Sequence, residues 1–381
     1  MGASPTPVLA PLAVAVSSNH VRLLRDGTAA FPAMLAAIAC AKEEVLLEMY
    51  WIGADRIGNL FRAALLERAA AGVRVCVLFD AIGSLATPDS FWKPLVDAGA
   101  EVQEFSPISP FKRRFRIERV AYRDHRKMLV VDGDVGFTGG INIGELWAPP
   151  EFPESAWRDD GIEICGPAAR DLRAAFYDVW GRVGRKVPAD AAVPNEKEHT
   201  RVRVLTNRIE AGPNRAIRRA YLSAVRHAAT SVDIASAYFL PGTRFLHALR
   251  AAARRGVRVR LLVPEHSDML FVALAMNSLY GRLLAAGAEV FAYSPRVLHA
   301  KTAIFDARYT MIGSHNLDAL SWRFNLECNV VVDSTEFAGV VRESFERDLR
   351  DAKKLDLEVW RRRPRWLRLI AWFAALFRTL L

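Results

Sequence analysis

His125 and Lys127 stand two residues apart in a run of strand-forming residues, and Asp132 follows at the next turn. On a strand, side chains two apart leave the same face, so an imidazole and an ammonium would point together. The returning strand leads into a glycine-rich segment that ends at Asn142. An imidazole can attack phosphorus or carry a proton, while an ammonium, a carboxamide and bare backbone N–H groups bind phosphate oxygens. The hairpin therefore predicts chemistry on a phosphate ester.

The same pattern occurs a second time, which makes it a strong signal. His299, Lys301 and Asp306 repeat the spacing H-x-K-x4-D. Both copies then run into a short segment whose expected role is to bind the phosphate, through Gly140 and Asn142 in the first copy and through Ser314 and Asn316 in the second. If the two copies meet, one histidine can attack phosphorus and the other can protonate the leaving alkoxide and then deprotonate the incoming hydroxyl. The lysines would stabilise the non-bridging oxygens, and this scheme needs no metal or other cofactor.

The paired motifs resemble the HKD motifs of the phospholipase D superfamily. The flanking sequence is most similar to the bacterial cardiolipin synthases, in particular the B type without amino-terminal membrane helices, from about Val21 to about Asp351. The resemblance implies a phosphatidyltransferase that moves a phosphatidyl group from phosphatidylglycerol, or from a donor such as phosphatidylethanolamine, to phosphatidylglycerol through a phosphohistidine. It implies His125 as the nucleophile and His299 as the acid and base.

Four carboxylates accompany the histidines. The family motif includes Asp132 and Asp306 in the catalytic set, but each stands at a turn, where turn chemistry alone explains an aspartate, and we favour a structural role. The resemblance implies that the carboxylate orienting each histidine lies downstream, at Asp159 and Glu327. Such a carboxylate would fix the tautomer and the basicity of the ring. Asp160 is an alternative beside the first of these.

Strands and helices alternate in both halves of the chain, which predicts mostly parallel central sheets with helices on both faces. Landmarks of the first half recur in the second: residues 48–51 correspond to 236–239, and residues 72–75 correspond to 256–259. The expected fold class is α/β, with two duplicated units related by a pseudo-two-fold axis. Such an axis would bring the two histidines into one cleft.

The organisation we expect has five parts, namely a flexible leader (1–18), a first unit (19–186), a linker (187–200), a second unit (201–352) and a tail (353–381). The tail interleaves arginines with tryptophans and leucines, which predicts a basic amphipathic helix lying in the membrane interface. A helix packing on its own domain or on a dimer partner is the alternative. No segment reaches the ~20 apolar residues of a membrane span.

Composition and net charge limit the chemical class of partner that the chain can bind. The 381 residues are 51% hydrophobic, which excludes a disordered chain, and the net charge of +10 predicts an anionic partner. The basic segment Lys112–Arg116 suits nucleic acid or anionic lipid equally, but the apolar tail favours lipid and makes nucleic acid unlikely. The four scattered cysteines make zinc unlikely. We expect a peripheral protein on the cytoplasmic face of the bacterial inner membrane. A hydrolytic phospholipase D, a nuclease of the superfamily and a non-catalytic lipid-binding protein are the alternatives.

Overall fold

The computed structural model describes residues 13–110, 121–150, 153–191, 201–207, 216–267, 269–364, 366, 370–371 and 373–374. The basic segment Lys112–Arg116, residues 1–12 of the leader and residues 192–200 of the linker lie outside the described residues, as does part of the tail.

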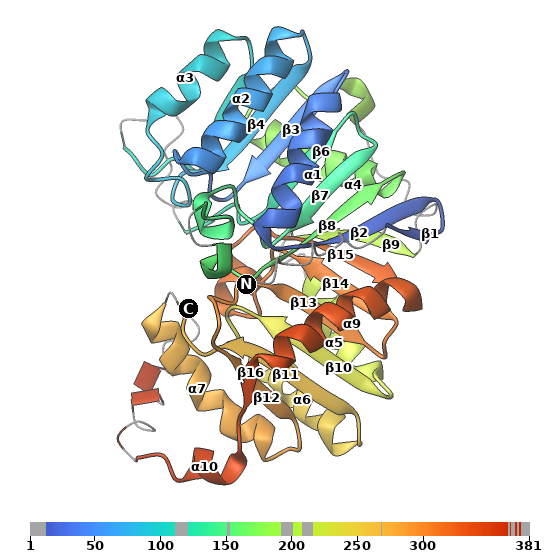
Figure 1. Ribbon diagram of the computed structural model, residues 1–381, viewed down its shortest axis with the longest axis vertical. Helices are drawn as coiled ribbons and strands as arrows, with labels where there is room; N and C mark the ends of the chain where they lie inside the picture. Colours follow the sequence, from blue (N-terminus) through green and yellow to red (C-terminus); the bar gives the residue numbers. More distant parts are fainter. Residues whose placement is uncertain are drawn as a thin grey trace, which may run out of the picture.

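The chain folds as two similar units, one after the other (Figure 1). The first contains β1 (Val14–Val16), β2 (Asn19–Arg25), α1 (Asp26–Cys40), β3 (Glu44–Met49), α2 (Arg56–Ala70), β4 (Arg74–Asp80), α3 (Asp89–Asp97), β5 (Glu101–Phe105), β6 (Lys127–Val131), β7 (Val135–Gly139), the short 3₁₀ helices η2 (Glu145–Trp147) and η3 (Pro153–Ser155), β8 (Asp160–Cys165), α4 (Ala168–Arg182) and η4 (Ala189–Ala191).

The second unit repeats this order of elements. It contains β9 (Val202–Thr206), α5 (Ala216–His227), β10 (Ser231–Ser236), α6 (Thr243–Arg254), β11 (Arg258–Pro264), α7 (Leu270–Leu284), β12 (Glu289–Tyr293), β13 (Lys301–Phe305), β14 (Tyr309–Gly313), α8 (Ala319–Arg323), β15 (Cys328–Asp333), α9 (Thr335–Arg350), β16 (Ala352–Lys354) and α10 (Leu357–Arg361).

Each unit is built on an eight-stranded sheet, in the orders β1-β2-β8-β7-β6-β3-β4-β5 and β16-β12-β11-β10-β13-β14-β15-β9. The duplicated α/β architecture is confirmed, but the sheets are mixed instead of mostly parallel. Among the described strands, the parallel pairs are those of β3–β4–β5 and of β10–β11–β12. The reason is local: the hairpins β6–β7 and β13–β14, and the strands added beside them, run antiparallel.

Part of the expected flexible leader is a strand. Val14 and Val16 bury their side chains in the core, and β1 pairs antiparallel with β2. The alternation of buried and exposed residues in this short segment is the pattern of an edge strand with one face on the core.

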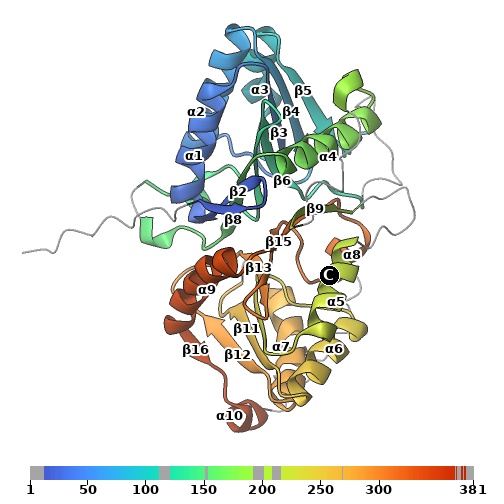
Figure 2. The same ribbon diagram turned by 90° about the vertical axis from the view of Figure 1, so that its right-hand side faces the viewer.

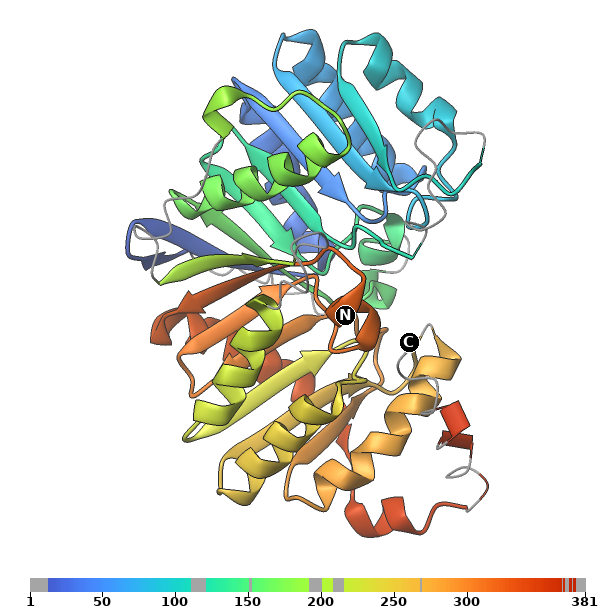
Figure 3. The same ribbon diagram turned by 180° about the vertical axis from the view of Figure 1, so that it is seen from behind.

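The two units share a hydrophobic cluster at their junction, and each unit has a further cluster of its own. Buried residues of β8 and α4, such as Ile162 and Phe176, belong to the same cluster as Val330 of β15 and Phe337 of α9. The contact is reciprocal, because α4 of the first unit packs on β9 of the second and α9 of the second packs on β2 of the first. Figure 2 shows α4 and α9 on the two sides of the junction of the sheets, and Figure 3 shows α4 (green) from behind. The reciprocity is what a pseudo-two-fold axis requires.

A buried ionic network crosses the same junction. The Arg158 side chain is 1% exposed and contacts Asp160 at 2.7 Å and Asp348 of α9 at 2.9 Å. Arg25 also binds Asp348, at 2.5 Å. Although burial raises it, the pKa of Asp348 lies below its usual value because Arg158 and Arg25 stabilise the carboxylate.

Removing the Asp348 charge should destabilise the protein. In Asp348→Asn the Arg158 guanidinium stays buried with fewer partners, so the free energy of unfolding should fall by about 3 kcal/mol. Glu343→Gln on the same helix removes only an exposed pair with Arg347 and should change it by less than about 0.5 kcal/mol. Urea unfolding of the two variants measures the difference. Equal losses would mean that the buried network contributes no more than the exposed pair.

Candidate active site

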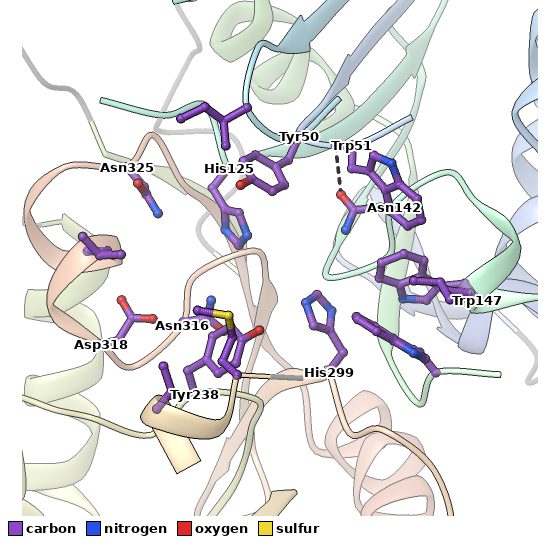
Figure 4. A pocket seen from close by; sticks show the side chains of 17 residues that line it. Tyr50, Trp51, His125, Asn142, Trp147, Tyr238, His299, Asn316, Asp318 and Asn325 are labelled. Atoms are coloured by element: carbon purple, nitrogen blue, oxygen red, sulfur yellow. Dashed lines mark hydrogen bonds between the residues drawn. The ribbon is translucent and has the colours of Figure 1, made fainter. Parts of the chain in front are cut away.

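Backbone hydrogen bonds between the units position the two histidines. The amide of His125 donates to the carbonyl of Leu326 at 3.0 Å, and the amide of His299 donates to the carbonyl of Arg158 at 2.7 Å. Each histidine is therefore held by the residue that directly precedes a carboxylate of the opposite unit. Figure 4 shows the two imidazoles facing each other across one cavity.

The carboxylates are exchanged between the units. Nδ1 of His125 lies 3.1 Å from Glu327, and Nδ1 of His299 lies 2.6 Å from Asp159. Asp159 and Glu327 are the carboxylates expected beside the histidines, but Asp159 precedes its partner His299 in the chain, so the expectation of a downstream carboxylate is wrong for His299. The reason is that the segments before β8 and β15 pair across the junction with the segments before β13 and β6, through bridges between Arg158 and Leu298 and between Leu326 and Asp124. Because a carboxylate only accepts, each Nδ1 carries the proton, and Nε2 is left for chemistry.

Two further donors hold the Asp159 carboxylate that contacts His299. Trp147 Nε1 donates to the same Asp159 oxygen at 3.0 Å, and the amide of Asp160 donates to the other oxygen at 2.9 Å. Although burial raises it, the pKa of Asp159 lies below its usual value because Lys301 and His299 favour the carboxylate. Burial and Lys301 lower the pKa of His299, while Asp159 opposes this shift.

The pair formed by Glu327 and His125 differs. Burial raises the pKa of Glu327 in spite of nearby His315 and Lys127. Burial, then Lys127 and Lys301, lower the pKa of His125 well below its usual value. A lowered pKa favours the neutral ring, which is the form that a nucleophile needs.

Both lysines are buried behind their histidines. Lys127 Nζ donates to the carbonyl of His125 at 2.7 Å, and Lys301 Nζ binds the carbonyl of His299 and lies 2.9 Å from its Nδ1. Neither side chain lines the main cavity. Both charges nevertheless lower the pKa values of both rings, so the field of the two ammonium groups reaches the space between the imidazoles.

The Lys127 charge should shape the pH profile. Burial is the main cause that lowers the pKa of Lys127 to about 7. As pH rises through this value the free enzyme loses the charge, so kcat/KM for a soluble phosphodiester should fall. A bound phosphate anion favours the ammonium, so kcat should fall only at higher pH. Initial rates across a pH series measure both profiles. Identical alkaline limbs for kcat and kcat/KM would contradict this assignment.

The two asparagines lie where phosphate would bind, but their glycine-rich neighbours do not. Asn142 and Asn316 are 4% exposed and line the cavity (Figure 4). Gly140 and Ser314 support the carboxylates instead. A side chain at Gly140 would collide with Asp159, 2.1 Å from Oδ1, and the Ser314 hydroxyl binds Glu327. The expectation that Gly140 and Ser314 bind phosphate is therefore wrong, because the carboxylates occupy that side of the segment.

The motif aspartates lie at the opposite ends of the strands from the histidines. Asp132 accepts hydrogen bonds from the amides of residues 42–44, and Asp306 accepts them from the amides of residues 229–231. These bonds lower both pKa values although burial opposes the shift. Their place in the expected catalytic set is corrected: they fix the loops before β3 and β10, as the turn interpretation favours.

The cavity has a volume of about 480 Å³, and the two units line it with different side chains. The first unit supplies three tryptophans, Trp51, Trp147 and Trp157, and the second supplies Tyr238, Asp318 and Asn325. Burial raises the pKa of Asp318 to about 7. Sequence reasoning missed Asp318, although it stands two residues after Asn316 at a position where the first copy has Gly144. Within the described part of the chain, no three His, Cys, Asp or Glu side chains are grouped as metal ligands.

Comparison with known proteins decides the family. Residues 34–146 and 221–349 match the family described as cardiolipin synthase, PLD-like domain. Cardiolipin synthase A from Pseudomonas entomophila (strain L48) is 34% identical over 346 residues, which cover 90% of this chain and 71% of that protein. Cardiolipin synthase A from Pseudomonas aeruginosa (strain LESB58) is 36% identical, with 88% and 68% covered. The chain belongs to the cardiolipin synthase family.

Membership of the cardiolipin synthase family confirms the relation inferred from the paired motifs. The two relatives named above carry the A designation, whereas the resemblance pointed to the B type; membership of the family is what the comparison decides. Among the described residues, no helix combines the length and the apolar composition that a membrane crossing requires.

Solved structures share the fold at low identity. The phosphatidylserine synthase from Haemophilus influenzae Rd KW20 superposes with a TM-score of 0.73 over 97% of both chains at 14% identity. A polyphosphate kinase from Porphyromonas gingivalis superposes with a TM-score of 0.60 over 89% of this chain and 49% of the kinase, also at 14% identity. These likenesses concern the fold alone, and they agree with the two duplicated units described above.

Proposed function

We propose that this member of the cardiolipin synthase family transfers a phosphatidyl group from one phosphatidylglycerol to a second, forming cardiolipin and releasing glycerol. Its class is phosphatidyltransferase, as the family relation gives it. The observation that carries the proposal is the pair of imidazoles, each oriented by a carboxylate of the opposite unit, that face one cavity. Phosphatidylethanolamine is a second possible donor.

The first displacement forms a covalent intermediate. Nε2 of His125 attacks the phosphorus of the donor, a nitrogen–phosphorus bond forms, and the bond from phosphorus to the headgroup oxygen breaks. The protonated Nε2 of His299 gives its proton to the leaving alkoxide. The Lys127 and Lys301 charges stabilise the negative charge that grows on the non-bridging oxygens, and Asn142 and Asn316 donate to them.

The second displacement reverses these roles. Neutral His299 takes the proton from a hydroxyl of the acceptor phosphatidylglycerol as that oxygen attacks phosphorus, and the bond to His125 breaks. His299 ends protonated and His125 neutral, as they began. The ionised Asp159 beside His299 supports this division of labour, since it favours the protonated form of that ring.

Membrane association follows from the lipid substrates, and we place the enzyme on the cytoplasmic face of the inner membrane. The described part of the tail supports an interfacial role. Trp366, Ile370 and Phe373 are exposed, whereas Ala371 and Ala374 are buried. This spacing gives one exposed apolar stripe and one face on the protein, which supports our proposal that the tail packs on its own domain and presents the stripe to the membrane interface.

The decisive assay incubates the pure protein with labelled phosphatidylglycerol in mixed micelles and separates the lipid products. We expect cardiolipin together with released glycerol. Phosphatidic acid alone would mean that water outcompetes the alcohol and that the enzyme is a hydrolytic phospholipase D. Lipid left unchanged, with turnover of an oligonucleotide, would instead favour a nuclease.

A further inference from the structure

Large apolar side chains are exposed around the mouth of the cavity. They form a set that we name the apolar rim: Ile82, Leu85, Leu146, Met269, Leu270, Phe271 and Leu320. Four of them, Ile82, Leu146, Met269 and Leu320, line the cavity itself. The most exposed are Leu85 at 67% and Leu270 at 74%. An enzyme for a water-soluble phosphodiester has no physical reason to keep such a border in water.

Both units contribute to the apolar rim. Ile82 and Leu85 stand in the turn after β4, Leu146 is in η2, residues 269–271 open α7, and Leu320 is in α8. The turn after β4 is held in shape, because the buried Asp80 carboxylate accepts from the amides of Ile82 at 2.9 Å and Gly83 at 3.2 Å. The exposed leucine is therefore presented by a fixed turn.

The size of the cavity requires the acyl chains of a phospholipid to stay outside. A volume of about 480 Å³ suits one ligand of moderate size and not the chains of two lipids. Chains outside the cavity cannot lie in water, since each methylene moved from hydrocarbon to water lowers the partition constant about fourfold. The phosphodiester must therefore reach the histidines while its chains remain in the leaflet.

We propose that the apolar rim inserts into the bilayer at the boundary of headgroups and acyl chains, so that phospholipids enter the cavity directly from the leaflet. The partner is the lipid surface, and the inference rests on the proposed function. The exposed stripe of the tail extends this surface, because Ala374 belongs to the same buried cluster as Val272 and Met276 of α7. Insertion from both units orients the molecule with its cavity facing the membrane.

The test replaces the two most exposed members of the rim, neither of which lines the cavity. Leu85→Glu with Leu270→Glu puts a charge on each side of the mouth. The matched control, Val96→Glu with Tyr309→Glu, charges one exposed apolar residue of each unit. Val96 is on α3, and Tyr309 is at the start of β14, at the turn end of the hairpin opposite His299. Binding to vesicles of equal parts phosphatidylglycerol and phosphatidylcholine is measured by sedimentation, and turnover of a soluble bis-nitrophenyl phosphodiester is measured in parallel.

The rim variant should lose vesicle binding at least tenfold and keep soluble turnover within twofold of the unchanged protein, while the control keeps both. Leu85→Ser with Leu270→Ser should also lower vesicle binding, but by less. These substitutions add no charge, so their effect cannot come from a folding defect caused by buried charges. Vesicle binding that is equal in the rim and control variants would overturn the proposal. So would a rim variant that only dissociates a dimer, seen by light scattering, since the rim would then bind a second copy. The sedimentation assay measures vesicle binding and does not depend on catalysis. A failure of the protein to form cardiolipin would therefore not change the outcome of this test.

Discussion

Replacing His125 with alanine should abolish phosphatidyl transfer, with kcat falling about 10⁵-fold or more. The variant lacks the nitrogen that forms the bond to phosphorus, and no other described residue at this place can supply one. His299→Ala should be less severe, about 10²- to 10⁴-fold, because it removes a proton carrier and not the nucleophile. Single-turnover rates with labelled phosphatidylglycerol measure both losses.

The acid–base role of His299 can be separated from the nucleophilic role of His125 by the leaving group. A donor with an acidic nitrophenol headgroup needs no protonation, so its first displacement should be largely restored in His299→Ala and not in His125→Ala. If the nitrophenol donor instead restored the first displacement in His125→Ala, His299 would be the nucleophile and His125 the acid and base. Full activity in both variants would remove the histidines from the mechanism.

Asp159→Asn should lower kcat about 10³- to 10⁴-fold although the residue does not touch phosphorus. One Asp159 oxygen accepts from the amide of Asp160, so the asparagine keeps its oxygen there and turns its NH₂ toward Nδ1 of His299 and the indole of Trp147. Nδ1 must then accept, which moves the ring proton to Nε2 and gives the wrong tautomer. The effect should fall on kcat with little change in KM.

The control for Asp159→Asn is a carboxylate of the motif that lies outside the cavity. Asp132→Asn weakens the bonds to the amides before β3 and should lower the free energy of unfolding by about 1 to 2 kcal/mol with kcat within about twofold. A loss of kcat in Asp132→Asn as large as in Asp159→Asn, in fully folded protein, would return the motif aspartates to the catalytic set.

The repeated spacing around His125 and His299 was sufficient to predict duplication, the two hairpins and a shared site. The reason is that a strand fixes which side chains share a face, and a turn-forming aspartate, followed by glycine in the first copy, marks where the strand ends. The turn role of Asp132 and Asp306 follows from the same local rule, and the backbone bears it out with positive φ values of 51° and 50°.

The sequence alone could not predict which carboxylate of one unit contacts which histidine of the other. Glu327 contacts His125 and Asp159 contacts His299 because the segments before β15 and β8 pair across the junction with the segments before β6 and β13. The spacing of residues within each half does not indicate this pairing. The mixed sheets were missed for a related reason, because strand–helix alternation indicates a parallel core but does not reveal the antiparallel strands added beside each hairpin. The roles of Gly140 and Ser314 depend on where the carboxylates lie, so they were wrong for the same cause.

The central claim is that two imidazoles from two units act in turn on one phosphorus atom. The most direct measurement quenches the enzyme in base during turnover of phosphatidylglycerol and maps the covalent adduct by mass spectrometry, with His299→Ala used to slow its breakdown. The account predicts a phosphatidyl group, or the glycerophosphoryl group left when base removes its acyl chains, on a ring nitrogen of His125. The nitrogen–phosphorus bond should survive base and break in mild acid. An adduct on another residue, or turnover to cardiolipin with no adduct at any time, would contradict it.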